Sequence, residues 1–314
     1  MRPTVLVATW RDGVFVLAES AQKHELAGQS VRGLAPDGLG GALAIVDGKA
    51  LRRRSLDGTW STLAAADCEL SCCLAAGDAI YVGTDDAARL LRLETGGELA
   101  PIPEFERVEG RETWSAGQML VGGKLVGPPL GVRSMAVTAS GVLLANVHVG
   151  GIARSTDGGA SFHPTIEVGS DVHEVRAHAN RAELVVAAAA IGLCTSRDGG
   201  ATWHIQSDGL HASYCSAVAF VGEEVWVAAS EHHFSKQGRI YRRSVDDDAA
   251  LGAVQGEGLP DWTDGIVDTH GIASSASHVA IADRAGNVYL SSDHGRSWSR
   301  LAAELSAPSS VLLA

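Results

Sequence analysis

The sequence predicts an all-β fold, a seven-bladed β-propeller, and three observations lead to this prediction. A short turn motif recurs along the chain, short apolar segments recur between its copies, and 37 of the 314 residues are Gly, well above the usual share of about 7%. A length of 314 residues also suits two ordinary domains, but propellers of this length form one unit. We therefore expect residues 1–314 to form a single domain, and six blades is the alternative count.

The recurring motif reads S-x-D-x-G-x-x-W/F. Its three full copies are STDGGASF (155–162), SRDGGATW (196–203) and SSDHGRSW (291–298). A shortened copy occupies residues 55–60, and residues 244–251 keep only the Ser and Asp. The Asp accepts backbone N–H bonds in a tight turn, and the Gly adopts a backbone angle that other residues resist. The first two copies lie 41 residues apart (157 to 198), which is the spacing of propeller blades.

The motif resembles the Asp-box, or BNR repeat, of the sialidase-like superfamily of β-propellers. The chain as a whole resembles bacterial BNR-repeat proteins of unassigned role. This resemblance implies a propeller fold with the motifs as structural turns, and it implies no particular reaction. The sialidases place an arginine triad and a tyrosine nucleophile in their pocket. Tyr214 with Arg32, Arg133 and Arg284 would imitate them, but the R-I-P segment that carries the first arginine is absent, so true sialidase activity is not expected.

Seven apolar segments are expected to be the second strand of a blade. They are residues 4–9, 42–46, 79–84, 142–146, 183–188, 224–229 and 278–283. The first of them has no inner strand before it, and the chain ends in the apolar segment SSVLLA (309–314). We expect the two terminal segments to share one blade, which closes the ring and removes its free edges.

Three segments exceed the length that four strands need: 103–129, 231–238 and 256–269. In an up-and-down blade their connections leave from the end of the ring opposite the motif turns. The insertions 103–129 and 256–269 are therefore expected on that end, the top face, where long loops commonly carry function. Trp10, Trp114 and Trp262 fall on the same face. They could stack on a sugar ring, pin the loops to the body, or offer a surface to a protein partner.

The start of each inner strand points at the mouth of the central channel, where we expect a pocket. Its candidate catalytic residues are His173, His270, Tyr214, Asp268 and Asp171. Its candidate ligand-binding residues are Arg11, Arg32, Arg133, Arg284, Trp10, Trp114, Trp262, Glu231 and His232. Its candidate metal ligands are His148, His173 and His270, and Asp85, His233 and Asp283 complete the mouth.

These residue types indicate two kinds of chemistry. Histidines and carboxylates in one cavity provide general acids and bases near neutral pH, and arginines hold carboxylates or phosphates. We therefore expect a small anionic or sugar-like ligand, with a hydrolase or lyase as the catalytic form. No organic cofactor is expected, and three histidines could instead bind a divalent metal. Two alternatives stay open: a merely polar, wet channel mouth, and a non-catalytic scaffold for protein partners.

Composition bears on partners and location. The formal net charge is −12, which argues against nucleic acid and anionic membrane surfaces as partners. No apolar run approaches the roughly 20 residues of a membrane span, and the start of the chain does not read as a signal peptide. The number of cysteines, five, is odd, and their spacing does not suggest a disulfide framework. We expect reduced thiols in a cytoplasmic protein.

Overall fold

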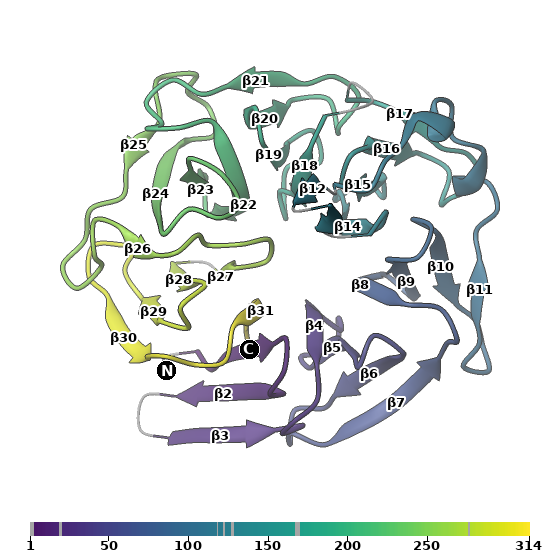
Figure 1. Ribbon diagram of the computed structural model, residues 1–314, viewed down its shortest axis with the longest axis horizontal. Helices are drawn as coiled ribbons and strands as arrows, with labels where there is room; N and C mark the ends of the chain where they lie inside the picture. The colour runs from purple at the N-terminus through teal and green to yellow at the C-terminus, as the bar shows by residue number, and fades with distance from the viewer. Residues whose placement is uncertain are drawn as a thin grey trace.

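Seven antiparallel sheets are arranged in a ring in the computed structural model (Figure 1). The structure describes residues 3–18, 21–117, 119–121, 123–126, 129–166, 170–275 and 277–314. The predicted seven-bladed propeller is confirmed, and the six-bladed alternative is wrong. The helices found in these residues are two 3₁₀ turns, η1 (Phe105–Arg107) and η2 (Arg111–Thr113). Within the described ranges, no helix has the length and apolar character to cross a membrane.

Each blade has four strands, which run in order from the channel outward. Blade 1 contains β31 (Pro308–Leu313), β1 (Val5–Thr9), β2 (Val14–Ala18) and β3 (Ala21–Glu25). Blade 2 contains β4 (Val31–Pro36), β5 (Ala42–Val46), β6 (Ala50–Arg54) and β7 (Trp60–Ala65). Blade 3 contains β8 (Leu70–Ala76), β9 (Ala79–Thr84), β10 (Leu90–Leu93) and β11 (Leu99–Pro101). Blade 4 contains β14 (Val132–Val137), β15 (Leu143–Val147), β16 (Gly151–Ser155) and β17 (His163–Pro164).

The remaining three blades follow the same plan. Blade 5 contains β18 (Val172–Ala177), β19 (Val185–Ala189), β20 (Gly192–Ser196) and β21 (His204–Gln206). Blade 6 contains β22 (Tyr214–Val221), β23 (Glu224–Ser230), β24 (Gln237–Ser244) and β25 (Gly252–Ala253), and β26 (Thr263–Asp264) pairs with β24. Blade 7 contains β27 (Ile272–Ser275), β28 (His278–Ala282), β29 (Val288–Ser291) and β30 (Ser299–Ala302).

The second strands form the core of the ring. Strands β1, β5, β15 and β19 are buried at every position, because each blade is covered on both faces by its neighbours. A strand covered on both faces reads as a continuous apolar run and not as an alternating pattern. In the core between blades 1 and 2, for example, Leu6 and Ala8 pack with Val31 and Ala44. All seven apolar segments chosen from the sequence coincide with a second strand to within two residues at either end.

The ring closes as predicted through the two terminal strands. β1 pairs antiparallel with β31, with Val7 opposite Val311. Beyond the strand ends, the N–H groups of Thr4 and Ala314 donate to each other's carbonyl oxygens at 3.0 and 2.8 Å. The inner edge of blade 1 is thus paired with the chain's own C-terminal strand, and the blade is complete.

The motif turns have the predicted hydrogen bonds. In the first copy, the Ser155 hydroxyl donates to Asp157 Oδ1 at 2.8 Å, and the N–H groups of Gly159 and Ser161 donate to Ser155 and Asp157 at 2.9 Å. The copies around Asp198 and Asp293 repeat this pattern. These turns join third to fourth strands at the end of the ring away from the channel mouth.

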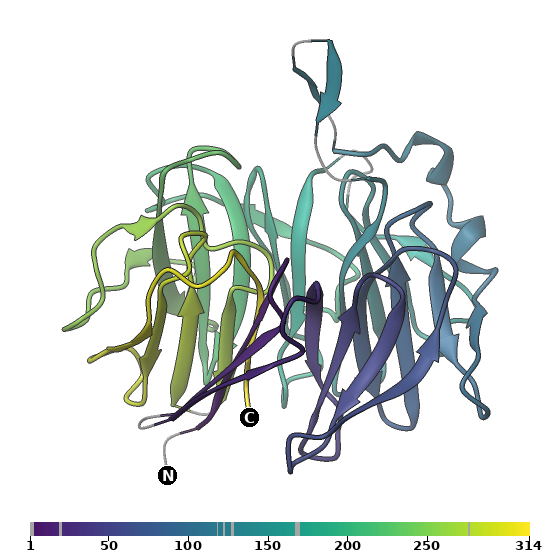
Figure 2. The ribbon, with the colours of Figure 1, turned by 60° about the horizontal axis from the view of Figure 1, so that its bottom comes forward.

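The long connections leave from the opposite end. The hairpin β12 (Met119–Val121) and β13 (Lys124–Val126) belongs to the connection between blades 3 and 4 and stands off the top face of the ring (Figure 2). Within the insertion 256–269, Asp264 pairs with Gln237 at the start of β24. The top face therefore carries the irregular structure, and the motif face is regular.

Candidate functional site

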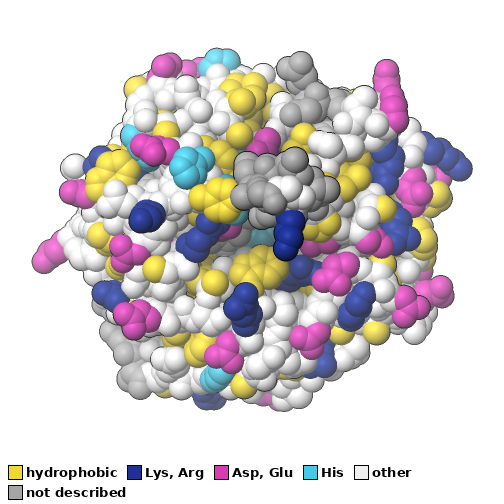
Figure 3. All heavy atoms as spheres, in the orientation of Figure 1, with side chains coloured by type: hydrophobic (Ala, Val, Ile, Leu, Met, Phe, Trp, Pro, Cys, Tyr) yellow, Lys and Arg dark blue, Asp and Glu magenta, His cyan; other side chains and the backbone are white. Residues whose placement is uncertain are grey.

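A cavity of about 750 Å³ lies at the channel mouth on the top face. Figure 3 views this face, where basic and hydrophobic side chains surround the central hollow. The cavity is lined by strand starts and loops from the whole ring. Its polar and aromatic lining residues are Trp10, Arg32, Ser71, Asp85, Arg133, His148, Asp171, His173, Tyr214, His232, His233, Phe234, Asp268, Thr269, His270, Asp283, Arg284, Ser309 and Ser310. Eleven of the residues proposed from the sequence as catalytic, ligand-binding or metal-binding are in this set.

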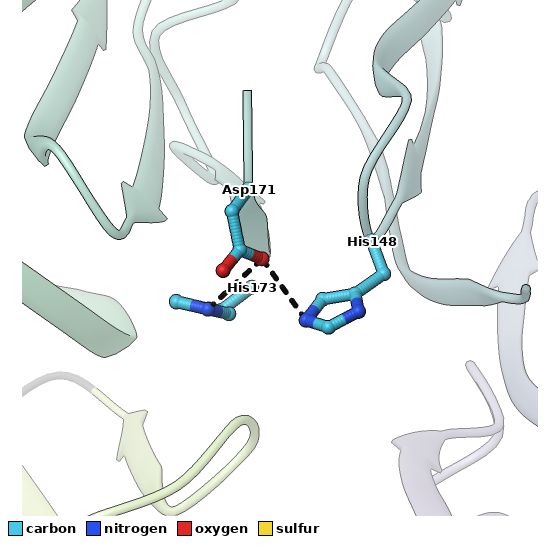
Figure 4. Close-up of side chains that lie close together, drawn as sticks. All are labelled: His148, Asp171 and His173. Atoms are coloured by element: carbon cyan, nitrogen blue, oxygen red, sulfur yellow. Dashed lines mark ion pairs between the residues drawn. The ribbon is translucent and has the colours of Figure 1, made fainter. Parts of the chain in front are cut away.

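One wall of the cavity brings together two histidines and an aspartate (Figure 4). His148 follows β15, Asp171 immediately precedes β18, and His173 is the second residue of β18. The Nε2 atoms of His148 and His173 lie 2.9 and 3.2 Å from the same oxygen, Asp171 Oδ1. Both histidines are buried, whereas the Asp171 side chain is 34% exposed. The cluster therefore opens to the cavity through its carboxylate.

Several polar atoms of this cluster have no hydrogen-bond partner among the described residues. His173 Nδ1 lies 2.5 Å from the carbonyl oxygen of Cys215. A carbonyl only accepts, so Nδ1 carries the proton and, in the neutral ring, Nε2 carries a lone pair. Within the described part of the chain, His173 Nε2, Asp171 Oδ1 and His148 Nδ1 are buried without a hydrogen-bond partner. Buried polar atoms without partners are uncommon and call for an explanation.

The cluster also shifts the pKa values of its members. Burial acts to raise the pKa of Asp171, but the interactions with His148 and His173 outweigh it, and the net pKa lies well below the usual range. Burial lowers the pKa of His148, and Asp171 only partly offsets this effect. At neutral pH the cluster therefore contains an ionised carboxylate beside a neutral imidazole of His148.

The three arginines of the cavity differ in their partners. Arg32 lies 2.5 Å from Glu69 and 3.3 Å from Asp85. Arg284 pairs with Asp268 at 2.9 Å and donates to the carbonyl oxygen of His233. Arg133 makes neither an ion pair nor a hydrogen bond with any described residue. It is half-buried at the second position of β14.

Two carboxyl groups near these arginines have pKa values shifted in opposite directions. Burial raises the pKa of Asp85, and the charges of Arg32 and Arg133 do not fully compensate. Burial acts in the same direction on Asp268, but Arg133 and Arg284 together hold its pKa below the usual range. The cavity thus holds one carboxyl group that retains its proton more readily and one that is readily ionised.

Tyr214 and His270 also line the cavity, as expected. The Tyr214 ring packs on His173 with centroids 4.6 Å apart. Burial, followed by the charges of Asp171 and Asp268, raises the Tyr214 pKa far above its usual value, so the phenol stays protonated. His270 has a left-handed backbone, with φ of 63°, and burial lowers its pKa to about 3.

The expected metal triad requires a correction. His148 and His173 lie together, but the third residue whose donor atom approaches theirs is Asp171, and the cluster found in the described residues does not include His270. His270 follows the connection from blade 6, and its N–H donates to the buried carboxylate of Glu174 at 3.2 Å. Asp171 was expected from the sequence only as a catalytic residue.

Four of the expected ligand-binding residues lie outside the cavity lining. Trp114 is buried in the core between blades 3 and 4, where its ring packs against Phe105. Trp262 lies beside Arg239, whose guanidinium carbon is 5.3 Å from the ring centroid. Arg11 and Glu231 are exposed next to the mouth. Trp114 thus anchors the long connection, which was the other role expected for these tryptophans.

Two residues near the channel were not chosen from the sequence. Phe234 is 58% exposed and lines the cavity beside the neighbouring histidines. Glu174 is fully buried, accepts N–H bonds from Val218 and His270, and pairs with Arg176 at 2.6 Å. A glutamate beside Val175 within the inner-strand segment VHEVRA (172–177) was the available signal for this second residue.

Comparison with known proteins identifies the fold. No protein-family model and no curated protein matches the sequence. Among solved structures, a GH74 enzyme of Niastella koreensis is similar over 95% of this chain, with a TM-score of 0.61 and 13% identity. The GH74 xyloglucanase of Xanthomonas campestris is similar over 87% of this chain, with a TM-score of 0.54 and 18% identity. U3-55K is similar over 92% of this chain, with a TM-score of 0.61 and 13% identity.

The shares of these proteins that the chain covers differ widely. The chain spans about half of the two GH74 enzymes, 47% and 44% of their lengths, and 86% of U3-55K. At these identities the similarity extends to the propeller fold alone. The residues of the cavity, and not the fold, must therefore indicate the function.

Proposed function

We propose that the protein binds a small anionic, sugar-like molecule in the mouth cavity and hydrolyses it in the manner of a glycosidase. We further propose that the motif turns are Asp-boxes and that the chain is a sialidase-like propeller without true sialidase activity. One observation carries the proposed ligand class: Arg133 faces the cavity with no carboxylate partner among the described residues.

The charge balance of the mouth supports an anionic ligand. Arg32 and Arg284 are already paired with Asp85 and Asp268. The charges of Asp85 and Asp268 attract Arg133, but its half-buried guanidinium has no hydrogen-bond partner among the described residues to replace its lost hydration. A ligand carboxylate that accepts two N–H bonds from Arg133 would remove this cost.

The aromatic residues of the rim support a ring-shaped ligand. Trp10 and Phe234 are 45% and 58% exposed at the cavity. Large exposed rings beside polar groups offer flat apolar surface for the face of a sugar, while neighbouring groups hydrogen-bond its hydroxyls. This combination fits an acidic sugar better than a simple inorganic anion.

The opposed pKa shifts of Asp85 and Asp268 support hydrolysis. Glycoside hydrolysis uses a protonated carboxyl group as general acid and an ionised carboxylate as base or nucleophile. We propose Asp85 for the acid role and Asp268 for the ionised role, since the directions of their pKa shifts suit these roles. The fold similarity to GH74 enzymes is compatible with this reaction class.

The binding test compares acidic sugars with their neutral counterparts. Isothermal titration with glucuronate, galacturonate and N-acetylneuraminate should detect at least one ligand that binds more tightly than glucose or galactose. We expect Arg133→Ala to weaken binding of that ligand at least about tenfold, the effect of losing a charge-assisted contact of about 1.4 kcal/mol or more. Arg300→Ala, an exposed arginine outside the cavity, is the matched control and should bind normally.

Equal affinity for acidic and neutral sugars, or unchanged binding by Arg133→Ala, would contradict the proposal. The hydrolytic step is tested separately with the aryl glycoside of the sugar that binds. Asp268→Asn should lower kcat by a factor of about 100 or more if it removes the ionised carboxylate, on the order of the effect of a general acid or base. A glycoside that binds but is not cleaved by the unmodified protein would leave a binding protein and exclude the hydrolase.

A further inference from the structure

We propose that His148, Asp171 and His173 form a binding site for one divalent transition-metal ion. The site lies in the wall of the mouth cavity, and it does not depend on the anionic ligand proposed above. It differs from the set expected from the sequence because a carboxylate replaces the third histidine.

The two separations between Asp171 Oδ1 and the histidine nitrogens are close to those of a metal site. Metal–ligand bonds of about 2.1 Å at tetrahedral or octahedral angles place neighbouring donors roughly 3.0–3.4 Å apart. Asp171 Oδ1 lies 2.9 and 3.2 Å from the two histidine Nε2 atoms. All three donor atoms lie within 4.8 Å of one another. Small rotations of the side chains about a shared ion are then sufficient for coordination.

The proton positions favour a cation between these atoms. His173 donates its Nδ1 proton to the Cys215 carbonyl, so its Nε2 lone pair faces a carboxylate oxygen in the neutral ring. Two lone pairs at 3.2 Å repel each other unless a proton or a metal ion lies between them. A histidine that donates its other nitrogen to a backbone carbonyl is also the usual arrangement of a metal-bound imidazole.

The unsatisfied atoms give a second, independent reason. His173 Nε2 and Asp171 Oδ1 are buried and have no hydrogen-bond partner among the described residues. Their side chains are 3% and 34% exposed, so the histidine nitrogen is shielded while the carboxylate reaches the cavity. An ion bound here satisfies both atoms and keeps coordination positions open toward the cavity.

The donor set indicates the class of metal. Two imidazoles and one carboxylate suit Zn²⁺, Fe²⁺ and similar ions, whereas Ca²⁺ and Mg²⁺ prefer oxygen ligands. Three protein ligands with an open position are characteristic of metal ions that bind water or substrate. We therefore infer a transition-metal site that exchanges ligands with the cavity.

The experiment uses the full-length protein without a histidine tag, stripped with a chelator and titrated with Zn²⁺. We expect one equivalent to bind, and X-ray absorption at the zinc edge to show two histidine nitrogens and oxygen ligands. Asp171→Asn and His148→Gln should each weaken Zn²⁺ binding more than about tenfold, at least the effect of losing a supporting residue of a metal site. Asp208→Asn and His204→Gln, exposed residues outside the cavity, are the matched controls.

Circular dichroism and thermal melting of each variant establish that the fold is retained. If one variant does not fold, the second variant and the absorption spectrum of the unmodified protein still decide the question. Binding of less than about a tenth of an equivalent at saturating Zn²⁺ would overturn the proposal. So would a zinc spectrum without histidine ligands, or unchanged affinity in folded Asp171→Asn and His148→Gln proteins.

Discussion

Two aspartates at opposite ends of the ring differ in how their oxygens are satisfied. In a motif turn, Asp198 Oδ1 accepts from the Ser196 hydroxyl at 2.8 Å and from the Thr202 N–H at 2.8 Å, and Oδ2 accepts from the Thr202 hydroxyl. At the mouth, Oδ1 of Asp171 lies between two imidazoles and has no hydrogen bond from a described residue. The pKa is lowered at both residues. A low pKa is therefore common to both carboxylates, whereas the hydrogen bonding of their oxygens distinguishes them.

The largest expected effect concerns how tightly a motif turn is packed. Gly295 and Gly159 occupy the same motif position, both with positive φ (77° and 97°). A Cβ at Gly295 would clash with the rigid ring of Trp226, whereas the atom nearest to a Cβ at Gly159 would be 3.8 Å away. We expect Gly295→Ala to lower the free energy of unfolding by about 2–4 kcal/mol, from backbone strain plus overpacking, and Gly159→Ala by about 1–2 kcal/mol, from strain alone.

Urea denaturation of the two variants measures this difference directly. Each serves as the control for the other, because residue type, motif position and backbone region are shared. Equal losses of stability would mean that the ring of Trp226 moves away without cost. The motif turns would then be independent of the blades that they contact, which contradicts the tight packing seen between blades 6 and 7.

The motif face was more predictable from the sequence than the mouth, for a physical reason. Each turn is local, since Ser155, Asp157 and Gly159 bond within a few residues, so spacing alone identifies it. The buried second strands are equally easy to recognise in the sequence, because they are continuous apolar runs. The seven blades and their closure followed from these two patterns.

The mouth is built from residues that are distant in sequence. Their spacing could predict which residues line the cavity, but not which of them pair with each other. The strand starts identified Asp171 and His173 as lining residues, and the loops between second and third strands identified His148. Spacing could not show that Arg133 lacks a partner among the described residues, because this depends on which carboxylates the other arginines pair with. Trp114 was misplaced because the path of a long connection decides whether its ring faces the cavity or the core.

A direct comparison of the two aspartates should give the second largest effect. Asp198→Ala removes several local hydrogen bonds and should lower the free energy of unfolding by about 1–2 kcal/mol, as the loss of a helix-capping residue does. Asp171→Asn should lower it by a smaller amount in metal-free buffer, because the substitution removes the attraction of the carboxylate to His148 and His173 but no hydrogen bond that fixes a turn. Chemical denaturation with a chelator present measures both. A loss in Asp171→Asn as large as that in Asp198→Ala would assign the mouth cluster a structural role.

The smallest effect is expected in the pH dependence of stability. The slope of stability against pH should have opposite signs for an aspartate of the motif face and an aspartate of the mouth. Hydrogen bonds from Ser161 and Ser155 lower the pKa of Asp157 to about 2 in the folded protein, against about 3.9 in an unfolded chain. Its contribution is complete above about pH 4 and is lost as the pH falls through the folded value. The stability of the unmodified protein relative to Asp157→Asn should therefore rise with pH between about 2 and 5.

Asp85 should show the opposite slope. Burial raises its pKa, so the folded state favours the protonated form, and ionisation at rising pH costs stability. Relative to Asp85→Asn, the unmodified protein should therefore lose stability as the pH rises from about 4, the unfolded value, through the raised folded value. Urea midpoints of both variants and the unmodified protein, measured from about pH 3 to 7, provide the two slopes. Slopes of the same sign would mean that Arg32 compensates the burial of Asp85, and Asp85 could not then serve as the general acid.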